Sequence, residues 1–167
     1  MMIAALAASV DFMNFTYAHN PCSGNVKVPV VMRGGSSSWQ DPNDPSMGFE
    51  FHVDKVVKGS LSPRTSQAVV VIACDGPFDG GAADAYLYDE HGKSATFIEK
   101  VGEAAWGSDW GESPSSIHVR FAGKYLYVDQ CKNVSACDEY VVTTYALRNG
   151  KFVKVYEQTH KRSSHEP

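Results

Sequence analysis

Residues 68–74 read AVVVIAC, a continuous apolar run that is rich in valine. The run is too short for most helices, and its β-branched residues favour a strand. Because none of its positions is polar, we expect a strand buried on both faces, instead of one that alternates between core and solvent. The run therefore predicts a β-rich core around which the rest of the chain is arranged.

Alternation of apolar and polar residues, which is typical of strands, recurs on both sides of this run. Residues 49–57 (FEFHVDKVV) alternate so that Phe49, Phe51 and Val53 would face the core. Residues 26–32 predict a further strand. Three hairpins are expected downstream, and the Asn149-Gly150 turn is the clearest signal because both residues tolerate positive φ. The hairpins pair residues 83–89 with 94–101, 117–121 with 125–131, and 139–148 with 151–157.

These eight or nine strands predict a mainly β fold, a single antiparallel sandwich, barrel or bent sheet. One short helix, near the N-terminus or within residues 102–116, would make it a β-rich α+β fold. Segments rich in Gly, Ser, Pro and Asp are expected to be loops. They are residues 33–48, 58–66, 75–81 and 102–116. We expect one domain over residues 11–159 and a flexible tail over residues 160–167.

Charge and hydropathy exclude several classes of protein. The chain has 167 residues and a formal net charge of -4, which argues against nucleic-acid binding because that needs a basic surface. It has no apolar run long enough to span a membrane. Residues 1–10 (MMIAALAASV) resemble the end of a signal peptide, and the alternative is the first turn of a buried helix. We expect a secreted or periplasmic protein of the cell envelope.

The four cysteines support export, because disulfides persist in oxidising compartments. Cys131 and Cys137 flank a short polar segment, so a local bridge between them is expected, and Cys22 then pairs with Cys74. On the loop-entropy model the two bridges contribute about 2.4 and about 4.2 kcal/mol respectively. The alternative is a zinc site made of all four cysteines, although the one close pair has the spacing C-x5-C instead of C-x(2–4)-C.

Tryptophans on loops are the candidate ligand-binding residues. Trp106 and Trp110 lie in the segment AAWGSDWGE, and Trp39 lies in another expected loop. Aromatic side chains dominate binding interfaces, and a loop tryptophan can offer a flat platform to a sugar or peptide. The alternative is that these rings fold back and cap the β core.

A calcium site is the one cofactor that the sequence suggests. Asp75, Asp79 and Asp84 lie among glycines that would allow oxygen ligands to converge. The segment does not match an EF-hand loop, and Asp and Gly are also ordinary turn residues. No catalytic motif, such as a nucleophile elbow or a phosphate-binding loop, is present.

The chain resembles a group of small exported bacterial proteins of unknown function. Residues 10–17 (VDFMNFTY), followed by Cys22, resemble the mature start of that group, and residues 67–71 (QAVVV) are similar to its "EAVV" strand. Residues 59–65 (GSLSPRT) lack the two acidic residues of the group's adjacent loop. The C-terminal half, with Cys131, Cys137 and the Asn149-Gly150 hairpin, is loosely similar to LppP/LprE-type lipoproteins. The resemblance implies export and a shared fold, and no activity.

Together these features predict a non-enzymatic, exported, disulfide-stabilised domain that binds a protein, peptide or glycan through loops at one end. A second hypothesis is a small secreted hydrolase with a dispersed Asp/Glu and His site, recognisable only by geometry. A third is a structural subunit of an envelope or surface assembly, held by pairing of edge strands.

Overall fold

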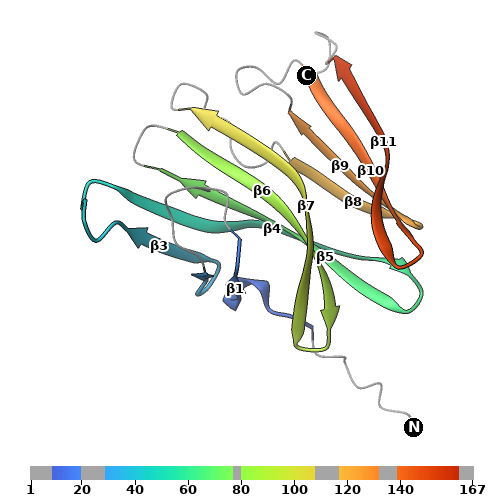
Figure 1. Cartoon of the computed structure of the whole chain (residues 1–167), viewed down its shortest axis with the longest axis horizontal. Helices are drawn as coiled ribbons and strands as arrows, with labels where there is room; N and C mark the ends of the chain where they lie inside the picture. Colours follow the sequence, from blue (N-terminus) through green and yellow to red (C-terminus); the bar gives the residue numbers. More distant parts are fainter. Residues whose placement is uncertain (1–8, 20–28, 77–79, 108–116, 132–138, 162–167) are drawn as a thin grey trace.

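The computed structural model describes residues 9–19, 29–76, 80–107, 117–131 and 139–161. Within these residues the chain forms eleven strands and a single 3-10 turn, Phe12–Asn14. The strands make three antiparallel sheets, none of them closed into a barrel (Figure 1). The predicted mainly β, sandwich-like fold is confirmed. No helix in the described part of the chain is long and apolar enough to cross a bilayer.

A five-stranded sheet forms the centre of the molecule, in the order β3-β4-β5-β6-β7. Its middle strand contains the apolar run, and every residue from 68 to 74 is no more than 1% exposed. The prediction of a strand buried on both faces is therefore confirmed. The strands are β3 (Ser36–Gln40), β4 (Gly48–Ser62), β5 (Thr65–Asp75), β6 (Gly80–His91) and β7 (Ser94–Gly107).

Successive side chains of β5 enter two separate hydrophobic clusters, as the pleat of a strand requires. Val70, Ile72 and Cys74 belong to one cluster, which also holds N-terminal residues. Val71 and Ala73 belong to the other, which holds residues of a second sheet. We call these two sides of the five-stranded sheet its N-terminal face and its sandwich face.

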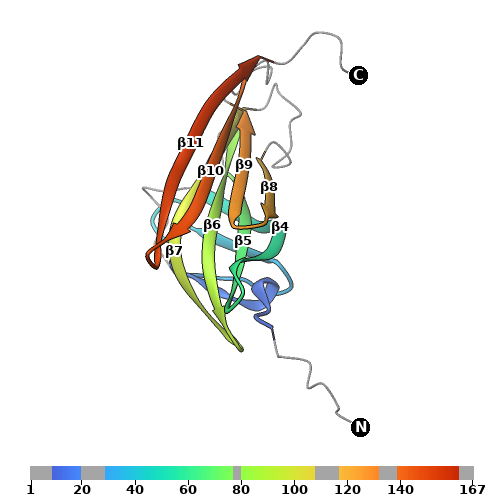
Figure 2. The same ribbon diagram turned by 90° about the vertical axis from the view of Figure 1, so that its right-hand side faces the viewer.

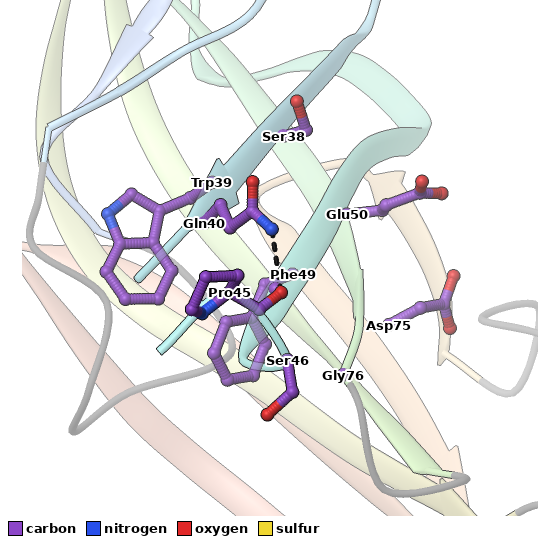
Figure 3. A pocket seen from close by; sticks show the side chains of 10 residues that line it. Ser38, Trp39, Gln40, Pro45, Ser46, Phe49, Glu50, Asp75 and Gly76 are labelled. Atoms are coloured by element: carbon purple, nitrogen blue, oxygen red, sulfur yellow. Dashed lines mark hydrogen bonds between the residues drawn. The ribbon is translucent and has the colours of Figure 1, made fainter. Parts of the chain in front are cut away.

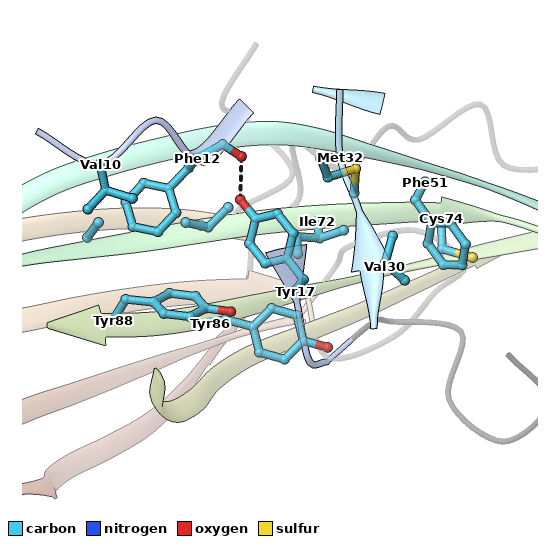
Figure 4. Close-up of a cluster of buried hydrophobic side chains, with 12 residues drawn as sticks. Val10, Phe12, Tyr17, Val30, Met32, Phe51, Ile72, Cys74, Tyr86 and Tyr88 are labelled. Carbon is cyan, nitrogen blue, oxygen red and sulfur yellow. Dashed lines mark hydrogen bonds between the residues drawn. The ribbon is translucent and has the colours of Figure 1, made fainter. Parts of the chain in front are cut away.

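The N-terminal face is covered by the 3-10 turn and by a two-stranded sheet, β1 (Thr16–Tyr17) with β2 (Val30–Val31). Tyr17 is fully buried there, and its hydroxyl donates a hydrogen bond of 2.6 Å to the Phe12 carbonyl (Figure 4). Phe12 in turn packs against Tyr88 of β6, with ring centroids 5.5 Å apart. Val10, Phe12 and Tyr17 are thus built into the core.

The sandwich face is covered by a four-stranded sheet, in the order β11-β10-β9-β8 (Figure 2). Ile117, Leu126 and Val128 are fully buried between the two sheets. The turn between β10 and β11 is at Asn149-Gly150, where both residues have positive φ, 52° and 72°. The strands are β8 (Ile117–Ala122), β9 (Tyr125–Cys131), β10 (Glu139–Arg148) and β11 (Lys151–Lys161).

Several stretches of the expected loops and tail form strand in the structure. They include β3, residues 58–62 at the end of β4, residues 80–81 at the start of β6, residues 102–107 at the end of β7 and residues 160–161 at the end of β11. Glycine explains two of these differences, because it permits close approach between the sheets. A Cβ atom on Gly59 would overlap the Phe121 ring, and one on Gly102 would lie 3.0 Å from Val128.

The described cysteines are consistent with the predicted bridges. Neither Cys74 nor Cys131 is a free thiol. Cys74 lies fully buried on the N-terminal face, in the cluster that also holds Tyr17 and Val30, the two ends of the segment that carries Cys22. Cys22 and Cys137 lie outside the described residues, so both pairings stay predictions.

Candidate functional site

Trp39 and Trp106 lie at one end of the five-stranded sheet. The strand register places Ser38 opposite Glu50 and Glu50 opposite Asp75. The same row continues through Gly81 to Trp106 on β7. Trp39 is the residue next to Ser38 on β3. Trp110, the third candidate, lies outside the described residues. Two of the three tryptophan positions thus belong to strands that end on the same side of the fold.

An open pocket of about 470 Å³ lies at this end, beside the hairpin formed by β3 and β4 (Figure 3). We call it the hairpin pocket. Its lining includes two carboxylates and no Lys or Arg side chain, so it favours a positively charged ligand. The lining residues are Ser38, Trp39, Gln40, Pro45, Ser46, Gly48, Phe49, Glu50, Asp75 and Gly76.

The carboxylates of Glu50 and Asp75 are direct cross-strand neighbours, and both point away from the aromatic rings of the pocket (Figure 3). Like charges opposite each other on a sheet are destabilising. Asp75 is half exposed, and its Oδ2 lies 4.0 Å from His52 Nδ1. Within the described chain, Glu50 forms no salt bridge. The Glu50 and Asp75 carboxylates can therefore bind a cationic group.

The Trp39 ring packs against the sheet, whereas a ligand platform would present its flat face to solvent. The Trp39 ring packs on Phe49, with centroids 5.8 Å apart and planes tilted by 36°. Both rings are partly buried against the cluster of the N-terminal face. Trp39 thus anchors β3 to the sheet, while its strand neighbour Ser38 lies on the same side as the carboxylates, as alternation requires.

The loop of the hairpin is held by turn chemistry. The Asp44 carboxylate accepts hydrogen bonds from the Ser46 amide (3.0 Å) and hydroxyl (2.6 Å). The Asp41 carboxylate accepts one from the Asn43 amide (2.8 Å). Across the loop, Gln40 Nε2 donates to the Pro45 carbonyl at 2.7 Å. These short-range contacts fix the rim of the hairpin pocket.

β3 forms an edge of the five-stranded sheet, and part of its backbone faces outward. Ser36 exchanges both of its backbone hydrogen bonds with Arg33, on the side away from β4, while the Gly35 carbonyl accepts from Val53 of β4. Because backbone groups alternate along a strand, the N–H and C=O groups of Ser38 and Gln40 also point away from β4. The sheet therefore offers them as a pairing edge beside the hairpin pocket.

The aspartates of the suggested calcium site do not converge. The unbroken register from Asp75–Gly81 to Ile72–Asp84 places Asp75 on the sandwich face and Asp84 on the N-terminal face. Asp79 lies outside the described residues. The part of the chain that the structure describes contains no group of three His, Cys, Asp or Glu side chains that could hold a metal ion.

Asp84 instead belongs to a polar network on the N-terminal face. Its carboxylate accepts a hydrogen bond from the Tyr86 hydroxyl at 2.8 Å. Lys100 Nζ lies 3.6 Å from Asp84 Oδ1 and 2.6 Å from Glu103 Oε2. Burial raises the pKa of the Asp84 carboxyl above its ordinary value of 3.8, and this outweighs the stabilising Tyr86 and Lys100 contacts.

We expect Asp84→Asn to reveal this raised pKa in the pH dependence of stability. The folded protein binds the Asp84 proton more tightly than the unfolded chain, so this stabilising contribution is present below pH 3.8 and lost as pH rises through the folded pKa. The free energy of unfolding of Asp84→Asn, relative to wild type, should therefore increase from pH 3 to pH 7, by about 1.4 kcal/mol per unit of pKa elevation.

Urea unfolding at several pH values measures this difference. Asp54→Asn serves as the control, since it removes an exposed carboxylate from β4. A difference between Asp84→Asn and wild type that stays constant between pH 3 and pH 7, or that falls with pH, contradicts the prediction.

The hydrolase hypothesis gains no geometric support at the hairpin pocket. The closest approach of a histidine to a carboxylate there is the 4.0 Å between His52 and Asp75, which is longer than a hydrogen bond, and both side chains are exposed. Neither group lies in the buried setting that tunes a catalytic acid or base.

Comparisons with known proteins identify no relative. No family model matches the chain, and no curated protein or solved structure matches it either. The chemistry and geometry of the described residues therefore carry the functional assignment.

Proposed function

We propose that this chain is an exported binding domain that captures an extended peptide segment carrying a basic side chain, at the edge of β3. One observation carries the proposal: an outward-facing backbone edge lies directly beside a pair of carboxylates that face no basic side chain in the pocket. Strand addition to such an edge supplies affinity through backbone hydrogen bonds, and side-chain sites supply specificity.

The side chains of β3 suit a long basic residue. A strand added to β3 would lie about 5 Å from it and about 10 Å from β4. Ser38, which lies between that strand and Glu50, is small and exposed. A Lys or Arg side chain can therefore extend across Ser38 to the Glu50 carboxylate, where a charge-assisted hydrogen bond would form, and Asp75 on the next strand adds negative charge beside it.

Export is supported by the cysteines. Cys74 and Cys131 are not free thiols, and disulfides are maintained in the periplasm, at the cell surface or in the medium. The apolar residues 1–8 of the proposed signal remnant lie outside the described residues. A peptide-binding edge needs no catalytic group and no cofactor, which fits the absence of a catalytic motif from the sequence.

The test uses two synthetic peptides, Ac-VTVKVTV-NH2 and its glutamate counterpart Ac-VTVEVTV-NH2, titrated by calorimetry. We expect the lysine peptide to bind and the glutamate peptide to bind at least about tenfold more weakly. Glu50→Gln combined with Asp75→Asn should weaken the lysine peptide by about tenfold or more, because both carboxylates lose their charge. Equal binding of the two peptides would overturn the proposal.

A matched control separates this site from general electrostatics. Glu99→Gln removes an exposed carboxylate from β7, the opposite edge of the same sheet, and should leave the affinity unchanged. Glu50→Gln should also raise the free energy of unfolding, by about 0.5 kcal/mol, because it removes a like-charge pair. If Glu50→Gln weakened peptide binding no more than Glu99→Gln does, Glu50 would have no part in the site.

A further inference from the structure

The outer face of the four-stranded sheet, which points away from the five-stranded sheet, has a composition unlike that of the hairpin pocket. Leu126 and Val128 point inward, so the alternate residues Tyr125 and Tyr127 point outward. The strand register then places their cross-strand neighbours on the same outer face. These neighbours are Arg120 and Ala122 on β8, Thr144 and Ala146 on β10, and Val153 and Tyr156 on β11.

Basic side chains collect at one end of this outer face. The two hairpin turns that the structure describes in this sheet, β8–β9 and β10–β11, lie there, and they bring Lys124 close to Arg148 and Lys151. Arg120 is one row further along. Asp129 is the single acidic residue that the register places on the described outer face. This concentration of positive charge stands out in a chain with a net charge of -4.

The basic groups lie over tyrosine rings. The Arg120 guanidinium is 3.9 Å from the centroid of the Tyr127 ring, and Lys124 Nζ is 5.5 Å from that of Tyr125. Tyr125 and Tyr127 contact each other edge to face, at 6.2 Å. Stacking on a ring orients a guanidinium without neutralising it, so its N–H groups remain available to an anion.

Tyr156 extends this surface to the far edge of the sheet and is 51% exposed. It lies across Thr144 from Tyr127, and Thr144 is buried between them. From β8 to β11 the surface is about 14 Å wide, since neighbouring strands are about 4.8 Å apart. We call it the outer-face patch: Arg120, Lys124, Tyr125, Tyr127, Arg148, Lys151 and Tyr156.

We propose that the outer-face patch binds an acidic polysaccharide, a second ligand of a different class from that of the hairpin pocket. Charge complementarity selects an anionic partner, and guanidinium groups bind carboxylates through paired hydrogen bonds. Tyrosine rings offer flat apolar faces that match the C–H faces of sugar rings.

Two other anionic partners fit the outer-face patch less well. An acidic peptide added as a strand would pair at the outer edge of β8 or β11, so it would not lie across the tyrosine rings of the central strand β9. An anionic bilayer usually receives a protruding apolar side chain, and of the exposed large hydrophobic residues in the described chain, Met13 and Val31 belong to the N-terminal segment and only Tyr156 to this sheet.

The test titrates the full chain with deca-galacturonate, which has a carboxylate on every sugar, and with neutral maltodecaose. We expect deca-galacturonate to bind, with an affinity that falls between 50 and 200 mM salt, and maltodecaose to bind at least about tenfold more weakly. Arg120→Ala and Tyr127→Ala should each weaken deca-galacturonate by about tenfold, whereas Lys93→Ala, at an exposed turn of the other sheet, should not.

Three outcomes would contradict the assignment of an acidic polysaccharide to the outer-face patch. Equal binding of the neutral oligosaccharide, equal effects of Arg120→Ala and Lys93→Ala, or binding to phosphatidylglycerol vesicles without binding to deca-galacturonate would overturn the proposal. Tyr156→Ala, at an exposed site, should also weaken deca-galacturonate binding without changing the thermal unfolding midpoint. This variant therefore distinguishes a loss of binding from a loss of folding. Glu50→Gln should leave deca-galacturonate binding intact, so the hairpin pocket and the outer-face patch are tested independently.

Discussion

Replacing either Val71 or Ile72 by alanine should destabilise the protein by several kcal/mol, although the two side chains point in opposite directions. Val71 is fully buried on the sandwich face and Ile72 is 1% exposed on the N-terminal face. Ile72→Ala should cost about 2 to 5 kcal/mol of unfolding free energy, through lost burial and the cavity left behind. Val71→Ala should cost about 1.5 to 3 kcal/mol.

Urea unfolding followed by circular dichroism measures both variants. Gln158→Ala on β11 is the control, because an exposed side chain on an edge strand should change stability by no more than about 0.5 kcal/mol. A strand covered on one face would tolerate substitution at every second position. If either Val71→Ala or Ile72→Ala matched the control, the two-sided burial of β5 would be wrong.

Removing the predicted Cys22–Cys74 bridge should also lower the free energy of unfolding by a large amount. The paired variant Cys22→Ala with Cys74→Ala should lose about 4.2 kcal/mol, because the bridge closes a long loop in the unfolded chain. The equivalent Cys131→Ala with Cys137→Ala should lose about 2.4 kcal/mol, since its loop is short. If formed, the predicted long-range bridge would join Cys22, in the sequence between β1 and β2, to the buried end of β5.

The comparison of the two paired variants by chemical denaturation under non-reducing conditions tests the pairing. Addition of a reductant should bring wild type down to the stability of a variant lacking all four cysteines and leave that variant unchanged. Peptide mapping of the oxidised protein identifies the bonded partners directly. Four reactive thiols in denatured protein from its native host, or a greater loss for the short loop, would contradict the assignment.

The sequence pattern predicts those strands and turns whose own residues favour the structure that they adopt. Residues 68–74 of β5 are uniformly apolar, and the hairpins at residues 122–124 and 149–150 have turn residues with positive φ. β3 has no such signal, because Ser36 and Ser38 have low strand propensity and glycines precede them. Its strand character comes from tertiary contacts, chiefly the packing of Trp39 on Phe49.

The candidate site was less accessible to sequence analysis than the fold. Trp39 and Asp75 were both selected, but for a ring platform and a calcium site respectively. The alternation of residues 49–57 places Glu50 at an outward position, but its pairing with Asp75 is set by strand register, which local composition does not encode. The outer-face patch was missed for the same reason, since Arg120 and Tyr127 meet only across β8 and β9.

The doubly buried strand β5 also determines how this protein would aggregate. Residues 68–74 combine high β propensity with no charge and no proline, the signature of segments that form steric zippers when exposed. In the native fold β4 and β6 occupy both of its hydrogen-bonding edges, and two clusters cover its faces. Recovery of soluble protein during expression and storage should therefore fall as the population of molecules in which β4 or β6 has detached increases.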